Sequence, residues 1–149
     1  MDRRPIDFAL VFGPNSTFEG AEGDAVVELA FLMANANGDA SPDELEALRS
    51  LIKHVSPSAN VGTTIEALAD TLGGAESIGD RVRAAASNLM RPRARELAYK
   101  AVYAIAVYDL ETNMEERELE DMVIGALRLD DKRAHELGLE TTHALLAKS

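Results

Sequence analysis

The sequence predicts an all-α protein: a single bundle-like domain of about seven helices with an internal pseudo-two-fold helix–acidic turn–helix repeat. Three observations predict this fold. Hydrophobic residues make up 46% of the chain but aromatic residues only 5%, so the core must consist mainly of Ala, Leu, Val and Ile, a composition that favours helix. Apolar residues recur at helical spacing through most of the chain. Finally, a very apolar segment followed by an acidic turn occurs twice.

Length and charge limit the possible functions. A chain of 149 residues suggests one domain, although we distinguish an N-terminal arm at 1–20 from the helical domain at 21–149. The net charge of -11 argues against nucleic acid and against direct contact with an anionic membrane. The absence of Cys excludes disulfides and thiolate chemistry. We find no signal peptide and no transmembrane segment, and therefore expect a cytoplasmic protein without direct membrane insertion.

The first twenty residues leave their conformation open. Ile6, Phe8, Leu10 and Phe12 alternate with other residues before Gly13. This pattern fits a short strand, a helical turn or an arm packed on the body of the domain.

Two segments are apolar on nearly every side, namely 24–36 and 96–108. Helices of this kind lie at the centre of a bundle. Each is followed by an acidic turn, at 37–44 and at 109–116, and each turn opens a charged helix. The repeat therefore predicts two central helices related by pseudo-symmetry.

The helix after the first turn has a strong start signal. Ser41 is the expected N-cap, Pro42 occupies the first helical position, and Glu44 completes a capping box. Asn113 is the expected cap after the second turn. The apolar stripes of these two helices are Leu45, Leu48, Leu51, Ile52 and Val55, and Leu119, Met122, Val123 and Leu127.

Three further helices complete the predicted bundle. One starts at Thr63 or Thr64 and ends before Gly73-Gly74. Another covers about 77–89. The last starts at Asp130 or Asp131, and Gly138 is a point where it can divide into two. The inward residues predicted for the helix at 77–89 are Ile78, Val82, Ala85, Ala86 and Leu89.

Basic residues are concentrated between positions 80 and 100. We interpret them as a solvated connection that offsets the acidic remainder, in preference to a phosphate or anion site. They are Arg81, Arg83, Arg91, Arg93, Arg95 and Lys100.

The acidic turns are the candidate site. Residues at i and i+2 of an extended turn can direct both side chains to one point, as Asn37 with Asp39 and Asp109 with Glu111 would. If the central helices pair, these oxygen-only groups suit Ca²⁺, Mg²⁺ or Mn²⁺, with Zn²⁺ a poorer fit. The simpler alternative is solvated acids beside helix N-termini, where they interact favourably with the helix dipole.

Other chemistries find less support. An EF-hand register would place Met33 at the first ligand position of the first loop, and Ile105 and Val107 at ligand positions of the second, which excludes it. Capping explains Glu44 and Glu116 without a ligand. The sequence contains no nucleophile elbow, no phosphate loop and no second copy of Glu140-x-x-His143 to form a di-iron site.

At the two turns the sequence resembles the TerB-like family, which includes tellurite-resistance TerB proteins and the amino-terminal domain of the DnaJ-like protein DjlA. The matching segments are Ala36-Asn37-Gly38-Asp39 and Tyr108-Asp109-Leu110-Glu111, each leading into a helix through Glu44 or Glu116. The resemblance covers about 22–147. It implies an all-helical fold and a metal-binding cluster at Asn37, Asp39, Asp109 and Glu111. In this chain Asn37 stands where the family has Asp, and Leu110 where it has Gly.

These observations lead to three functional hypotheses. The first is a non-enzymatic domain that binds a divalent cation and acts through protein contacts; the resemblance implies a role in tellurite or stress response within a membrane-associated complex. The second is an interaction module without metal. The third, least supported, is a metal-dependent hydrolase, for which the sequence offers no separate general base.

Overall fold

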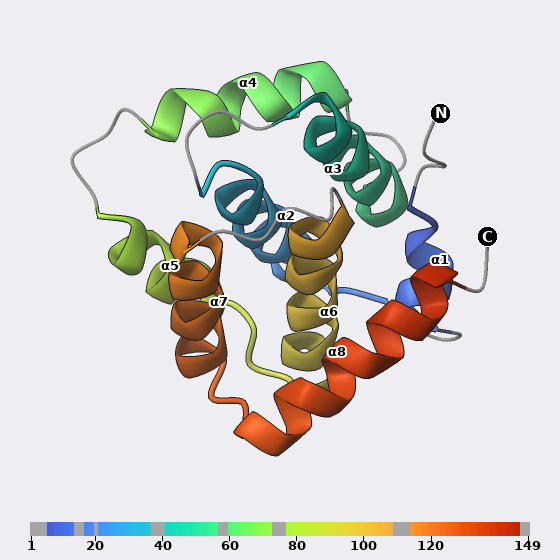
Figure 1. Cartoon of the computed structure of the whole chain (residues 1–149). Coiled ribbons are helices and arrows are strands. Elements are labelled where there is room, and N and C mark those ends of the chain that lie inside the picture. The colour runs from blue at the N-terminus through green and yellow to red at the C-terminus, as the bar shows by residue number, and fades with distance from the viewer. Residues whose placement is uncertain are drawn as a thin grey trace.

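The computed structural model describes residues 6–13, 17–19, 21–36, 41–56, 60–72, 77–108 and 114–146. Every regular element in these ranges is a helix, which confirms the all-α prediction, and the helices pack into one bundle (Figure 1). The helices are α1 Phe8–Phe12, α2 Glu22–Ala34, α3 Pro42–Val55, α4 Val61–Leu72, α5 Ile78–Ser87, α6 Pro92–Tyr108, α7 Met114–Ala126 and α8 Asp131–Leu146.

The centre of the bundle is the pair formed by α2 and α6. Every residue of α2 except Asp24 and Glu28 is buried. From Leu97 to Ala106 in α6, only Tyr103 is not buried. These two helices make the most extensive contact between elements of the described chain, as expected for helices that are apolar all round.

The packing around this pair is reciprocal. The helix that follows α2, α3, packs on both α2 and α6, and the helix that follows α6, α7, packs on both α6 and α2. Helix α5 lies against α2 and α7, while α8 lies against α6 and α1. Each of the two central helices is therefore packed against both α3 and α7 (Figure 1).

The segment whose conformation the sequence left open forms the short helix α1. The Asp7 carboxylate accepts a hydrogen bond from the Ala9 amide at 3.0 Å and caps it. Phe8, Val11 and Phe12 are buried, and the Phe12 ring packs edge-on against Phe18. Helix α1 therefore contributes to the core, with contacts to α3, α6 and α8.

The start signals of the helices are largely confirmed. Ser41 and Glu44 form the predicted capping box, and Ser77 caps α5. Helix α4 begins at Val61, before the predicted Thr63, because the Asn60 side chain accepts a hydrogen bond from the Thr63 amide at 3.0 Å.

Two residues predicted to face inward are exposed. Ile78 is 43% exposed because it is the first residue of α5. Met122 is 45% exposed because the core is filled instead by Leu119 and Val123 of α7 and by Leu127 just after it. Helix α8 is continuous through Gly138, which is buried against the ring of Tyr103 on α6. A Cβ at Gly138 would lie 3.1 Å from Cε2 of Tyr103, so this glycine allows α6 and α8 to approach closely.

Helix α4 is the most weakly anchored of the longer helices. None of its residues 61–70 is fully buried. Val61, Ile65 and Leu68 pack against the core but are only partly buried. It lies at the edge of the bundle, beside α3 (Figure 1). Within the described ranges, no helix combines the length and the apolarity needed to cross a membrane.

We expect the backbone amides of α4 to exchange with deuterium before those of α2 and α6. Few buried contacts hold α4, so it can open locally while the core stays folded. Hydrogen-exchange mass spectrometry checks this expectation, and protection of α4 equal to that of α6 would contradict it.

A matched pair of glycine substitutions tests the close approach of α6 and α8. Gly138→Leu should lower the free energy of unfolding by about 1–3 kcal/mol, because the new side chain overlaps the Tyr103 ring. Gly125→Leu on the exposed side of α7 should raise it by about 0.5–1 kcal/mol, since no atom lies within 4 Å of an added Cβ and helix propensity improves. Urea denaturation measures both changes, and equal effects would contradict the packing described here.

Candidate functional site

In the sequence, the two predicted acidic turns directly follow the ends of the central helices α2 and α6. Helix α2 ends at Ala34, and Asn35 closes it by donating a side-chain hydrogen bond to the Phe31 carbonyl at 2.9 Å. The Ala36 amide donates to the Met33 carbonyl at 3.1 Å. In Figure 1, α2 and α6 both run toward the half of the molecule that contains α3 and α4. The described helix ends therefore lie in the same half of the bundle.

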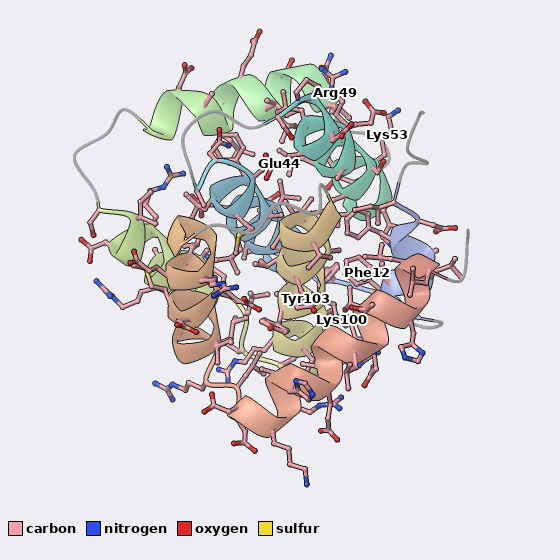
Figure 2. The ribbon with its side chains drawn as sticks, in the orientation of Figure 1. Phe12, Glu44, Arg49, Lys53, Lys100 and Tyr103 are labelled. Atoms are coloured by element: carbon pink, nitrogen blue, oxygen red, sulfur yellow. The ribbon has the colours of Figure 1, made fainter. Side chains whose placement is uncertain are left out.

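The first turn is followed by a tightly hydrogen-bonded helix start. The Ser41 amide donates to the Glu44 carboxylate at 3.0 Å, and the Glu44 amide donates to the Ser41 hydroxyl at 3.1 Å. Glu44 is only 2% exposed and lies between α3 and α2 (Figure 2). Capping therefore accounts for one oxygen of this carboxylate, Oε1, as the sequence predicts.

The four predicted ligands, Asn37, Asp39, Asp109 and Glu111, all lie outside the described residues. The same holds for the predicted cap Asn113 and for the side chain of Glu116. Within the part of the chain that is described, no group of three or more His, Asp or Glu side chains is arranged to hold a metal ion. The site remains a prediction from the sequence.

The basic stretch between 80 and 100 connects helices to one another. Arg81 is 5% exposed and pairs with Glu28 of α2 at 3.0 Å. Arg91 binds both carboxylate oxygens of Glu22, at 2.9 and 2.5 Å, and donates to the Thr17 carbonyl at 3.1 Å. The first pair joins α5 to the middle of α2, and the Arg91 contacts hold the start of α2 against the loop before α6.

The remaining basic residues continue this pattern toward α1 and α8. Lys100 is 5% exposed, and its ammonium lies 2.8 Å from the Glu140 carboxylate and 3.4 Å from the Val11 carbonyl. Arg93 donates to the Phe12 carbonyl at 3.2 Å. Figure 2 shows Lys100, Phe12 and Tyr103 together where α1, α6 and α8 meet. The interpretation as a solvated connection is therefore wrong for Arg81 and Lys100, although the exposed Arg83 fits it.

Contacts between helices and burial shift the pKa values of three side chains. Hydrogen bonds from Arg133 hold the pKa of the Glu96 carboxyl below its ordinary value, and Lys100 does the same for the pKa of Glu140. Burial raises the pKa of the Tyr99 hydroxyl, which donates to Glu120 at 2.6 Å. These groups join α6 to α8 and α6 to α7.

A shallow groove lies where the end of α2 meets α5 and α7. Its volume is about 180 Å³. Leu32, Asn35 and Ala36 contribute from α2 and the residues just after it, and Ile78 from the start of α5. The α7 residues that line it are Glu118, Leu119 and Met122. The groove is mostly apolar, and it adjoins the residues that lead into the first acidic turn.

Comparisons of this chain with protein-family models, curated proteins and solved structures find no match.

Sequence reasoning missed the two ion pairs that join α6 to α8, Lys100–Glu140 and Arg133–Glu96. A signal for the first was present, because Lys100 stands inside the otherwise apolar stretch 97–108 and so requires a buried partner. The groove had no such signal. It arises where three segments that are distant in the sequence come together.

The ion pair between Lys100 and Glu140 should contribute measurably to stability. Glu140→Gln should lower the free energy of unfolding at pH 7 by about 1–2 kcal/mol, because the buried ammonium loses its carboxylate. The effect is below that of a fully buried pair because the Glu140 side chain is 46% exposed. Glu136→Gln is the control, since Glu136 lies 3.7 Å from Arg133 and is 49% exposed.

The pH dependence of the same variant has a defined sign. The folded-state pKa of Glu140 lies below its ordinary value of 4.5. The ion pair with Lys100 therefore contributes fully to the free energy of unfolding above pH 4.5, and this contribution is lost as the pH falls through the folded-state pKa. The stability difference between wild type and Glu140→Gln should therefore disappear in acid. Urea titrations at several pH values measure it, and a difference that is independent of pH would contradict the assignment.

Proposed function

We propose that this protein is a non-enzymatic, TerB-like helical domain that binds a divalent cation at its two acidic turns and acts through protein contacts. The observation that carries the proposal is the duplicated turn, with oxygen-bearing residues at i and i+2 in both copies. These residues are Asn37, Asp39, Asp109 and Glu111. From the resemblance we further propose a cytoplasmic role in tellurite or stress response, with a membrane-associated protein complex as partner.

The arrangement of the helices supports the cation part of this proposal. The helices before the turns, α2 and α6, form the central pair, and both end in the same half of the bundle (Figure 1). Carboxylates brought close together repel one another, and a cation removes that repulsion. Carboxylate and amide oxygens are the preferred ligands of Ca²⁺, Mg²⁺ and Mn²⁺.

The apolar groove favours a second candidate, an interaction module that needs no metal. Exposed Ile78 and Met122 beside a mostly apolar groove are typical of a contact surface. The two candidates differ in one respect: partner capture that persists in excess chelator supports the module without metal.

The cation site is tested by titrating metal-free protein with Ca²⁺, Mg²⁺, Mn²⁺ and Zn²⁺ in a calorimeter and by following the melting temperature. We expect heat of binding and a raised melting temperature with at least one of the first three, because a ligand of the folded state stabilises it. Asp39→Ala/Glu111→Ala should abolish both effects. The control Glu46→Ala/Asp70→Ala removes two exposed acids outside the turns and should retain them. Identical titrations of wild type and the turn variant would remove the cation from the proposal.

A further inference from the structure

We propose that the groove between α2, α5 and α7 binds a basic amphipathic helix of a partner protein. This inference rests on the protein-contact part of the proposed function and is independent of the cation. It follows from the size of the groove, its apolar lining and the charge beside it.

The size of the groove indicates what can occupy it. Pockets for small molecules usually have volumes of about 300–1,000 Å³. A groove of about 180 Å³ is too small for such a ligand. It has room for one or two apolar side chains that project from a larger molecule lying across the surface.

The lining of the groove is suited to such side chains. Leu32 and Leu119 are buried at its base, while Ile78 and Met122 are 43% and 45% exposed beside it. An unbranched Met side chain adapts to differently shaped apolar partners. The apolar face of an amphipathic helix presents side chains at i, i+3, i+4 and i+7, which is a common way to fill a groove of this kind.

The charge beside the groove selects a basic partner. Glu118 lines the groove, and Glu118, Asp121 and Met122 have the i, i+3, i+4 spacing that places them on one face of α7. Neither Glu118 nor Asp121 forms an ion pair with another residue in the described ranges. Arg117 is the one basic residue in the sequence of α7. With a net charge of -11 the protein repels anionic membranes and attracts Lys and Arg.

The test uses a fluorescent, 18-residue amphipathic peptide with Leu on one face and Lys on the other, titrated with the full chain in EDTA. A peptide with Glu in place of Lys serves as the charge control. Met122→Lys should weaken binding by at least about tenfold, because it removes an apolar contact and adds repulsion. Glu118→Lys should weaken it by about threefold to tenfold. The matched controls are Leu139→Lys, an exposed leucine on α8, and Glu46→Lys, an exposed acid on α3; both should bind as wild type does.

Methyl NMR of the methionines gives a second readout that does not depend on a substitution. The Met122 methyl signal should shift when the basic peptide is added, whereas that of Met90, which is 77% exposed on the loop before α6, should not. Shifts at Met122 together with groove-dependent affinity support the proposal. Because EDTA is present, this result holds whether or not a cation binds at the turns.

Three outcomes would overturn the proposal. The first is no binding of the basic peptide, and the second is binding that Met122→Lys and Leu139→Lys weaken equally. The third is self-association in sedimentation that Met122→Lys abolishes, which would make a second copy of the chain the occupant of the groove.

Discussion

The fold depends on burying two helices that have almost no polar side. A helix that is apolar all round can be stable in water only if other elements cover it in every direction. In α2 only Asp24 and Glu28 escape burial, and in the middle of α6 only Tyr103 does. This constraint explains why the two helices pack on each other and why the described helices α1, α3, α5, α7 and α8 all lie against one or both of them.

The single charged residue inside the middle of α6 explains a second layer of the structure. Burying the Lys100 ammonium without a partner would cost far more than any apolar contact returns. Glu140 from α8 and the Val11 carbonyl from α1 supply that partner, so one lysine fixes the positions of two peripheral helices. Arg133 adds a second ion pair between α6 and α8, while Arg81 and Arg91 bind carboxylates of α2. These basic groups bind carboxylates of α2, α6 and α8, so they do not neutralise the exposed acids of α7.

The sequence predicted what local chemistry determines. Helical periodicity and capping signals located the helices after α1, and the Ser41–Glu44 capping box is confirmed. The sequence left the conformation of α1 open, because a segment of five residues is too short for its periodicity to distinguish helix from strand. The exposure of Ile78 and Met122 depends on how α5 and α7 are rotated, which single-helix patterns leave open. The groove could not be predicted either, because it depends on the same rotations of α5 and α7. The four proposed turn ligands were predicted from residue type and spacing alone, and they lie outside the described residues.

The groove and the proposed cation site are adjacent along the chain, and their coupling depends on what holds the residues between them. Asn35 and Ala36 line it, and the next residue along the chain is Asn37, a proposed cation ligand. A cation that fixes the turn would also fix this wall of the groove, so that a partner would lose less conformational entropy on binding. Linkage then requires that a partner which prefers the ordered wall strengthen cation binding by the same factor as the cation strengthens partner binding. If instead the capping hydrogen bonds of Asn35 already hold the wall in place, the coupling free energy is close to zero. The hydrogen bonds from Asn35 to the Phe31 carbonyl and from Ala36 to the Met33 carbonyl favour that second case, in which the groove is preformed and the protein contact needs no metal.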